Sequence, residues 1–570
     1  MRLIGIGASE GVAFGKVFKL DKVVFELSDE KTEVPEEEII ALRKAIGAAE
    51  KQIEEIKTRA IAQLSTEEAA IFDAHLAILN DPELMDQTCC LIQQQHFKAE
   101  KAYYEIAEKF TSIFEMMDND YMKERAAYIK DVSRRVLSNL LQVTLTDPTD
   151  IKEEVIIVAE DLTPSDTAQL DRRYTKGFVT QVGGRTSHSA IMARSLEIPA
   201  VVGIEGIFSK VAHGDNLMID GSSGSVIINP TADDWKEFNE KKADFEKKKE
   251  GMLAYKDQPT LSNDGCSVEL AANIGSVQDL EGVLQNGAEG IGLFRTEFLF
   301  MGKKTCPDEE LQYEAYKTVL ETMGDKPVVI RTLDVGGDKE IDYIHVSDEM
   351  NPFLGHRAIR LCLDRQDIFN IQLRALLRAS FHGNLKIMFP MIATLDEYRE
   401  AKKMLEACKV DLLQEGYPVS ERIEVGIMVE IPSTAVLADQ FAKEVDFFSI
   451  GTNDLIQYTF AADRINEKVA YLYQPFNPAL LRMIKMVIDA SHSVGKWTGM
   501  CGEMAGNIMA APLLLGLGLD ELSMSATSIL PIRKLMADIN KKEMEQLAKR
   551  ALQCGTSDEV LDLIKDYINF

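Results

Sequence analysis

The stretch VGGRTSHSAIMARS, residues 182–195, places His188 between a glycine pair and an apolar-periodic run. Gly183 and Gly184 allow a tight turn, and the residues after His188 predict a helix, so the imidazole is expected at a helix N-terminus. Backbone N–H groups and the helix dipole favour an anion there. Imidazole, with an unperturbed pKa of about 6.5, is largely neutral at pH 7 and keeps a nucleophilic lone pair. These features predict a histidine that carries a phosphoryl group.

Three polar neighbours of His188 have two interpretations each. Arg185 and Arg194 could neutralise phosphate oxygens, although either could instead pair with carboxylates. Thr167, in DLTPSDTAQL, could orient the imidazole by hydrogen bonding, but a helix cap explains that stretch equally well. The remaining histidines have no comparable context and are predicted to be structural: His75, His96, His213, His345, His356, His382 and His492.

A second set of charged residues stands where apolar runs of the second half end. Glu430 and Asp454 end successive runs and supply the hard oxygen ligands that suit one Mg²⁺ in contact with phosphate. A surface salt bridge is the alternative for either carboxylate. Arg295, Arg331 and Arg464 offer planar forks for a small molecule that carries both carboxylate and phosphate.

Cys501, in TGMCGEM, also ends an apolar run. A buried structural thiol is the default interpretation of such a cysteine. Its position within the charged set raises the alternative that the thiol is a proton donor.

The elements that must position these residues are eight β-rich runs separated by helical patterns. This number and spacing predict a (β/α)8 barrel, in which chemistry gathers at the C-terminal ends of the strands. The runs are residues 268–275, 290–297, 327–337, 385–392, 424–432, 447–454, 497–504 and 521–525.

The first half of the chain predicts an α/β domain with a helical insertion. Residues 35–142 contain little glycine, and their apolar residues recur at steps of three and four. Short strands with glycine turns precede and follow this segment. The fold class expected is therefore multidomain α/β, with an N-terminal α/β phosphohistidine domain, an inserted helical bundle and a C-terminal TIM barrel.

The expected domain boundaries follow from these changes in pattern. The α/β domain takes residues 1–20 and 146–230, and the helical insertion takes residues 21–145. Residues 231–258 form a charged linker helix, and residues 259–570 form the barrel.

The bulk composition excludes several kinds of partner. The chain has 570 residues and a net charge of −29, which argues against nucleic acid or an anionic membrane surface and favours a basic protein partner. No basic leader or membrane-spanning apolar run is present, so a cytoplasmic location without membrane insertion is expected. The eight cysteines are scattered and are expected to be free thiols.

Several motifs together closely resemble enzyme I of the phosphoenolpyruvate:sugar phosphotransferase system. The resemblance covers essentially the whole chain, the helical insertion included. The motifs are VGGRTSHSAIMARSLEIPAVVG, GLFRTEFLFM, RTLDVGGDK, NPFLGHRAIR, IMVEIPS, FFSIGTNDLIQYTFAADR and GKWTGMCGEMAG.

This resemblance implies that phosphoenolpyruvate phosphorylates His188 and that the phosphoryl group then passes to a histidine of the small phosphocarrier HPr. Cys501 would protonate the enolate carbon to give pyruvate. The family binds its carrier through the helical insertion and forms a homodimer through the barrel. His356 departs from the family pattern, which has a larger aromatic there beside Arg357. Mg²⁺ would lie on Glu430 and Asp454, and phosphoenolpyruvate would contact Arg295, Arg331, Asn453, Asp454 and Arg464, with help from Lys339 and Arg357.

Other classes of protein remain as alternatives. A pyruvate phosphate dikinase or phosphoenolpyruvate synthase shares the histidine domain and the barrel but needs an ATP-binding domain, for which the chain leaves no room. A nitrogen-regulatory paralogue would carry an extra N-terminal sensor domain, whereas this chain starts at its first strand. A non-catalytic regulator that binds phosphoenolpyruvate would need neither His188 nor Cys501. For the enzyme, we expect hinge motion around the linker helix, since His188 must meet both substrate and carrier.

Overall fold

The computed structural model divides the chain into two compact units, Met1–Lys249 and Glu250–Phe570, which are described separately below. It describes residues 1–20, 23, 25, 27–63, 71–116, 120–145, 148, 151–167, 169–171, 173–184, 187–195, 198–301, 305–337, 341, 343–344, 349–463 and 466–567.

A mixed sheet forms one part of the first unit, with strand order β1-β8-β7-β3-β4-β5-β6-β2. The long strand β3 pairs in parallel with β4 and antiparallel with β7, so chain segments far apart in sequence meet in one sheet. Its strands are β1 (Arg2–Ile4), β2 (Ile6–Ser9), β3 (Val12–Leu20), β4 (Val155–Ala159), β5 (Thr175–Thr180), β6 (Ala200–Val202), β7 (Asn216–Asp220) and β8 (Ser225–Ile228).

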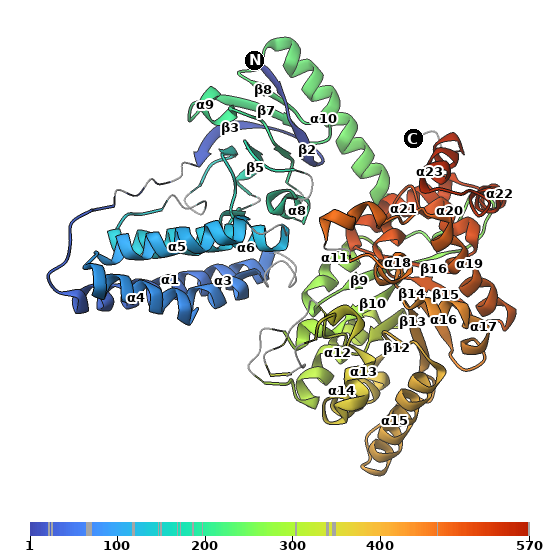
Figure 1. Ribbon diagram of the computed structural model, residues 1–570. Coiled ribbons are helices and arrows are strands. Elements are labelled where there is room, and N and C mark those ends of the chain that lie inside the picture. Colours follow the sequence, from blue (N-terminus) through green and yellow to red (C-terminus); the bar gives the residue numbers. More distant parts are fainter. Residues whose placement is uncertain are drawn as a thin grey trace. The chain divides into compact units, whose positions relative to one another are not determined.

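A helical bundle is inserted between β3 and β4 (Figure 1). Along its first helix the apolar stripe turns inward, because Leu42, Ala49 and Ile53 have no exposed surface. One apolar cluster continues from these residues to Ala190 and Met192 beside the sheet. The bundle consists of α1 (Pro35–Gln63), α3 (Ile71–Leu79), α4 (Pro82–Gln95), α5 (Ala99–Met116) and α6 (Asp120–Leu141).

In the described part of the first unit, four further helices accompany the sheet. The longest, α10, begins by packing onto the sheet, because Trp235 contacts Phe14 with ring centroids 4.3 Å apart and Phe238 is buried against Met218 and Ile227. The charged segment expected as a linker is thus anchored to the first unit by aromatic residues. The four helices are α7 (Pro164–Thr167), α8 (His188–Ser195), α9 (Ile207–Lys210) and α10 (Ala232–Leu253).

The second unit is a closed barrel of eight parallel strands, with β16 pairing back onto β9. Every β-rich run named from the sequence overlaps one of these strands, so the multidomain α/β fold and its TIM barrel are confirmed. The strands are β9 (Glu269–Ile274), β10 (Gly290–Arg295), β11 (Pro327–Arg331), β12 (Asn384–Phe389), β13 (Glu424–Val429), β14 (Phe447–Ile450), β15 (Trp497–Met500) and β16 (Glu521–Met524).

Helices surround the barrel, and the main apolar core of the unit lies between them and the strands. Within the described residues, no helix of either unit has both the length and the apolar character needed to cross a membrane. The barrel helices are α11 (Leu280–Gln285), α12 (Glu309–Met323), α13 (Ile359–Asp364), α14 (Gln366–Ala379), α15 (Leu395–Gln414), α16 (Pro432–Val436), α17 (Ala438–Phe441), α18 (Thr452–Phe460), α19 (Pro478–Ser493), α20 (Ala511–Leu517), α21 (Ala526–Asp538), α22 (Lys541–Ala551) and α23 (Ser557–Tyr567).

Arg533 of α21 holds the segment before β9 against the rest of the unit. Its side chain is 1% exposed, and its guanidinium donates to the carbonyls of Tyr255, Lys256 and Gly287 at 3.2, 2.8 and 2.6 Å. The three carbonyls are partly buried, and this one side chain supplies a donor to each of them.

Replacing Arg533 with leucine should therefore destabilise the barrel by about 3 kcal/mol, since it leaves three partly buried carbonyls without their donors. The measurement is the urea unfolding transition of the full chain. Arg482→Leu is the matched control, because Arg482 donates to the Leu552 carbonyl at an exposed site. Equal losses from the two substitutions would contradict this assignment.

Candidate active site

The charged residues of the second unit gather at the C-terminal ends of the barrel strands. Arg295 and Arg331 are the last residues of β10 and β11, and they lie opposite each other in the strand register. Glu430 directly follows β13, and Asp454 lies in the first turn of α18, just after β14. Parallel strands bring all of these ends to one rim of the barrel.

Arg331 is held between two acidic side chains. It is 5% exposed, and its guanidinium lies 2.5 Å from Glu297 Oε1 and 2.9 Å from Asp334 Oδ2. Burial alone would lower the pKa of Arg331, but Glu297 and Asp334 together raise it above its usual value. The guanidinium is therefore a fixed positive charge.

Arg357 shares Asp334 with Arg331. Its Nη2 donates to Asp334 Oδ1 at 3.0 Å, and its Nη1 donates to the Tyr458 hydroxyl at 3.3 Å. The side chain is 2% exposed. Asp334 thus fixes two guanidinium groups side by side, an arrangement suited to a ligand with more than one negative group.

Glu430 and Asp454 form the acidic part of the rim. Glu430 is 1% exposed and accepts the Met391 backbone N–H at 2.5 Å. Asp454 Oδ1 is buried without a hydrogen-bond partner among the described residues, and Arg357 Nη1 lies 3.6 Å away. Burial raises the pKa of Glu430 to about 8, and the Asp454 carboxylate adds to this effect. The two carboxyl groups are therefore buried close enough for each to disfavour ionisation of the other.

Cys501 directly follows β15 and is 4% exposed. Its Sγ lies 3.9 Å from the Ile450 carbonyl, to which the thiol donates. Burial raises the pKa of the thiol to about 11, so it holds its proton at neutral pH. A protonated thiol close to the two guanidinium-bearing strands is consistent with the predicted proton donor as well as with a structural cysteine.

Asn453 and the last residues of α18 extend the rim. Asn453 Oδ1 accepts from the Tyr473 hydroxyl at 3.2 Å, and its Nδ2 donates to Glu503 at 3.2 Å. Tyr458, which sequence reasoning missed, accepts from Arg357 and donates to the Phe353 carbonyl at 2.5 Å. Its position four residues after Asp454 places both on one helix face, and this spacing was the available signal.

Buried side chains also fix the ends of β10 and β11. Thr296 Oγ1 donates to the Arg331 carbonyl at 2.8 Å, and Gln372 Nε2 donates to Thr296 Oγ1 at 3.0 Å. Gln372 Oε1 accepts the Leu333 N–H at 2.9 Å. The backbone on both sides of Arg331 is therefore held by hydrogen bonds, so the Arg331 side chain is attached to a rigid segment.

His356, the departure from the family pattern, lies beside this cluster. Its backbone N–H donates to Glu349, and its Nε2 is 3.7 Å from Asp364 in α13. The imidazole side chain is 33% exposed. The larger aromatic of the family pattern is not required for Arg357 to reach Asp334, because Arg357 donates to Asp334 with histidine at position 356.

In the first unit, α8 begins at His188. Gly183 has φ +115°, and the Ser187 hydroxyl donates to the Gly184 carbonyl at 2.8 Å, so the turn before the helix is tight. The backbone therefore puts residue 188 in the first turn of a helix. Its role as phosphohistidine stays a prediction.

Of the other predicted site residues, the structure describes Thr167 and Arg194. Thr167 is buried and its hydroxyl donates to the Thr163 carbonyl at 3.1 Å. Arg194 is exposed and donates to the Ala8 carbonyl at 3.0 Å. Arg185, Lys339 and Arg464 lie outside the described residues.

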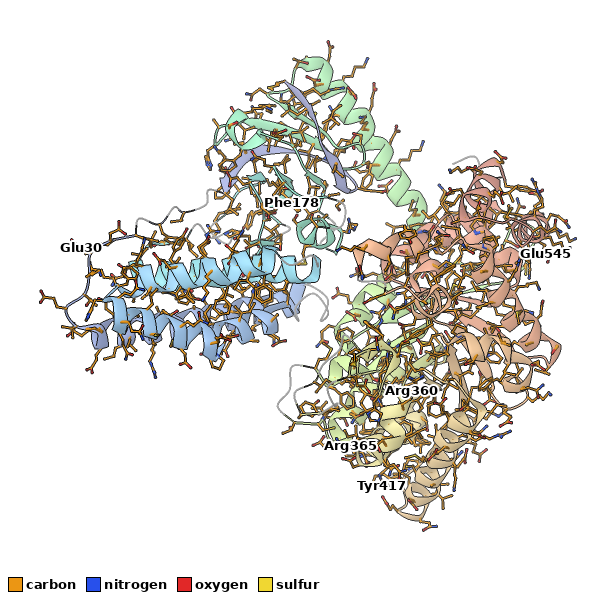
Figure 2. The ribbon with its side chains drawn as sticks, viewed as in Figure 1. Glu30, Phe178, Arg360, Arg365, Tyr417 and Glu545 are labelled. Carbon is orange, nitrogen blue, oxygen red and sulfur yellow. The ribbon has the colours of Figure 1, made fainter. Side chains whose placement is uncertain are left out.

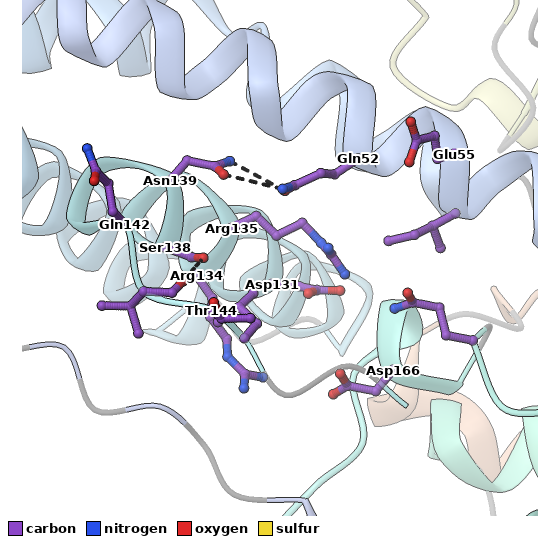
Figure 3. Close-up of a pocket in the computed structure, with 14 residues that line it drawn as sticks. Gln52, Glu55, Asp131, Arg134, Arg135, Ser138, Asn139, Gln142, Thr144 and Asp166 are labelled. Carbon is purple, nitrogen blue, oxygen red and sulfur yellow. Dashed lines mark hydrogen bonds between the residues drawn. The ribbon is translucent and has the colours of Figure 1, made fainter. Parts of the chain in front are cut away.

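A polar cavity of about 530 Å³ lies between the bundle and α7 (Figure 3). From α6, Arg134 and Arg135 line it, and the Nε atom of each is buried without a hydrogen-bond partner in the described part of the chain. Asp131 of α6 links the bundle to α7, since its carboxylate accepts the Ser165 N–H at 3.2 Å. Because α7 packs against α8, this junction connects the bundle to the helix that begins at His188.

Asp334→Ala should destabilise the full chain by about 3–5 kcal/mol, because it leaves two buried guanidinium groups short of their shared carboxylate. Asp367→Ala is the control. Asp367 is an exposed residue of the same unit that pairs at 2.7 Å with Arg365, which is labelled in Figure 2, and its loss should cost less than about 1 kcal/mol. Urea unfolding of both variants measures the difference, and similar losses would show that the Asp334 pairs are not buried in solution.

Comparisons with known proteins identify families and structures to which this chain is similar. Three family models match: "PEP-utilising enzyme, PEP-binding domain" over residues 249–541, "PEP-utilising enzyme, N-terminal" over residues 4–125, and "PEP-utilising enzyme, mobile domain" over residues 151–224. A solved structure described as the NMR solution structure of Enzyme I (nEIt) is 43% identical over 43% of this chain and 99% of that chain, with a TM-score of 0.39.

Curated relatives match almost the entire chain. The phosphoenolpyruvate-protein phosphotransferase of Staphylococcus carnosus is 56% identical over 99% of this chain and 98% of its own length. That of Geobacillus stearothermophilus is 58% identical over 98% of this chain and 97% of its own length. At this identity and coverage, the chain belongs to the phosphoenolpyruvate-protein phosphotransferase family and is a phosphotransferase.

Proposed function

We propose that the protein takes the phosphoryl group of phosphoenolpyruvate onto His188, releases pyruvate, and passes the phosphoryl group to a histidine of the phosphocarrier HPr. The observation that carries the proposal is the buried cluster of Arg331, Asp334 and Arg357 beside Cys501 at the barrel rim. A small substrate with phosphate and carboxylate groups suits two fixed guanidinium groups. The names of the curated relatives support the donor and the reaction class.

The first half-reaction moves one phosphoryl group. A neutral imidazole nitrogen of His188 attacks phosphorus, the bond from phosphorus to the enol oxygen breaks, and the electron pair stays on the enolate. Arg331 and Arg357, with Arg295, Asn453, Arg464 and Lys339 as further proposed contacts, stabilise the developing negative charge. Cys501 then gives its thiol proton to the enolate carbon, which forms pyruvate. This protonation makes the transfer of the phosphoryl group from the enol oxygen effectively irreversible.

Glu430 and Asp454 are the proposed ligands of Mg²⁺. The two carboxylates fit a divalent ion, because Asp454 Oδ1 is buried without a hydrogen-bond partner in the described residues and burial beside Asp454 raises the pKa of Glu430. Among the described side chains, no group of three or more His, Cys, Asp or Glu is placed to hold a metal ion. When bound, Mg²⁺ supplies charge neutralisation for the phosphoryl group.

The second half-reaction needs a docked carrier. We place carrier binding on the helical insertion, homodimer formation on the barrel and the activity in the cytoplasm, as the family resemblance implies. The net charge of −29 favours a basic partner surface. Since His188 must serve both substrate and carrier, the segment after the anchored part of α10 is the proposed hinge.

Labelling with [³²P]phosphoenolpyruvate and Mg²⁺, without carrier, tests the proposal against a non-catalytic regulator. We expect an acid-labile, base-stable label at one site per chain, and its loss in His188→Ala, because phosphohistidine has this lability. Discharge of the label onto purified HPr tests the second half-reaction. Reversible binding without a covalent label would support the regulator, and a requirement for ATP would support a dikinase-like enzyme.

The hinge makes a separate prediction. A bifunctional crosslinker that joins the two units should slow at least one half-reaction tenfold or more, because one fixed arrangement does not serve both encounters. Quenched-flow measurement of each half-reaction separates the effects. A monofunctional reagent of the same chemistry is the control, and full speed in both half-reactions after crosslinking would refute the hinge.

A further inference from the structure

Cys501 lies just beyond the point where the pairing of β15 with β16 ends. The last paired residues of the two strands are Met500 and Leu522. The Cys501 N–H donates to the Ile450 carbonyl of β14 at 3.1 Å, and the Cys501 thiol donates to the same carbonyl at 3.9 Å. On this side, Cys501 is therefore held by the end of β14.

The carbonyl of Cys501 is held from the other side, by Asn273 of β9. Asn273 Nδ2 donates to this carbonyl at 3.0 Å. Ala272 and Ile274 pack outward, in the core between the strands and the helices, so Asn273 faces the inside of the barrel. Because β16 lies between β9 and β15, the Asn273 side chain reaches past one strand to the peptide that carries the thiol.

Ser523 of β16 fixes the orientation of the Asn273 amide. The Ser523 hydroxyl has no exposed surface and donates to Asn273 Oδ1 at 2.6 Å. Because a carbonyl only accepts hydrogen bonds, the Cys501 carbonyl requires Asn273 Nδ2 on its side, which leaves Oδ1 for the Ser523 hydroxyl. The two hydrogen bonds together therefore select one of the two orientations of the amide.

The neighbouring strand β10 leaves room for this contact. A Cβ at Gly292 would lie 2.5 Å from both Cβ and Oγ of Ser523. The pairing of β10 with β9 is irregular between Ile291 and Leu293, and Leu293 is paired with Asn273. A glycine at an irregular register typically marks a place where another group approaches closely. The inside of the barrel thus accommodates the hydrogen bond between Ser523 and Asn273.

The residues after Cys501 are held by the start of α18. A Cβ at Gly502 would lie 2.6 Å from the Thr452 backbone nitrogen, so glycine is needed for this close approach. The Glu503 N–H donates to Asn453 Oδ1 at 3.3 Å. Within the described part of the chain, Asn273 is the one side chain that hydrogen-bonds to the Cys501 peptide.

The place of Cys501 is close to the proposed substrate contacts. Cys501 is 4% exposed and belongs to an apolar cluster inside the barrel that includes Met428. Arg331 Nη1 lies 3.6 Å from Met428 Sδ. A buried thiol in the barrel wall reaches a substrate bound at Arg331 from one direction, so a small rotation of its peptide would change where the proton is delivered.

We propose that Asn273 is a positioning residue, whose hydrogen bond to the Cys501 carbonyl aims the thiol at one face of the enolate. This inference rests on the proposed role of Cys501 as proton donor. The S–H bond breaks as a C–H bond forms at the methylene carbon, and the enolate oxygen becomes the carbonyl oxygen of pyruvate. The electron pair of the S–H bond stays on sulfur, and the thiolate takes a proton from water before the next turnover. A planar enolate has two faces, so a fixed donor gives one stereochemical product, whereas a loosened donor gives both.

Protonation of (Z)-3-fluorophosphoenolpyruvate in D₂O tests the aim of the thiol. The thiol exchanges to S–D, and delivery to one face gives a single enantiomer of 3-fluoro[3-²H]pyruvate. Immediate reduction by lactate dehydrogenase and NADH converts the enantiomers into diastereomers that ¹⁹F NMR distinguishes. We expect one diastereomer from the wild type. Asn273→Leu, which keeps the approximate volume of the side chain but has no N–H, should give both, and an undiminished excess of one diastereomer would contradict the proposal.

Rate measurements separate positioning from damage to the fold. In quenched-flow experiments with [³²P]phosphoenolpyruvate, Asn273→Leu should label His188 at close to the wild-type rate. Pyruvate should form about tenfold to a hundredfold more slowly, because misplacement of a reacting group by about 1 Å has effects of this size. A merely structural Asn273 would slow both steps together and leave the stereochemistry unchanged. Ser523→Ala, which releases the amide without removing it, should give a smaller change in the same direction.

Asn286→Leu is the matched control. Asn286 Nδ2 donates to the Gly282 carbonyl at 2.9 Å where α11 ends, so it makes the same kind of hydrogen bond before β10 begins, away from the C-terminal strand ends. Urea unfolding should give similar midpoints for the two leucine variants, whereas only Asn273→Leu should change the stereochemistry. Loss of the diastereomer excess in both variants would attribute the effect to stability and refute the positioning role.

Two further outcomes separate this inference from the proposed function. If Cys501→Ala abolishes the diastereomer excess while Asn273→Leu keeps the wild-type excess and rate, the positioning role is wrong and the donor role stands. If Cys501→Ala keeps the excess, Cys501 is not the donor and the positioning role fails with it.

Discussion

The buried charge at the barrel rim is the constraint on which the rest of the site depends. Two guanidinium groups, of Arg331 and Arg357, face the carboxylates of Glu297, Asp334 and Asp454 in a region with almost no exposed surface. Charges in such a region are tolerated only when they are paired and hydrogen-bonded. The geometry of the pairs is therefore as important as their presence.

This constraint extends into the backbone around the rim. Met391 donates its N–H to Glu430, and it does so with φ +55°, a left-handed conformation that a non-glycine residue rarely adopts. Ala358, next to Arg357, has φ +51° and no exposed surface. Strained residues of this kind persist where the surrounding packing holds them, and here both adjoin side chains of the charged cluster.

Charge also shapes the interior below the rim. Because Gly290, Gly292 and Gly499 have no side chains, the barrel has room inside for the carboxyl groups of Glu269 and Glu521. Apolar side chains in the same space would avoid the desolvation cost of two buried acids. Charged groups also lie beside an apolar core in the first unit, where Arg134 and Arg135 line a polar cavity.

Much of this could be predicted from local sequence patterns. Runs of apolar residues marked each barrel strand, and the residues at their ends, such as Glu430 and Asp454, followed from the rule that barrels place chemistry there. Tyr458 and the Glu269–Glu521 pair were missed. A tyrosine inside an apolar helix and a glutamate at the start of a strand look ordinary in sequence, because their partners come from distant segments.

The sequence by itself determined the order and type of the elements, the barrel, the inserted bundle and the chemical character of the residues at the strand ends, since each depends on periodicity and residue type within a short window. Only the tertiary structure decided which arginine shares Asp334, which glycines face a carboxyl group, and how far α10 packs on the sheet. Those features depend on strand register and on contacts between segments hundreds of residues apart, and no local pattern records them.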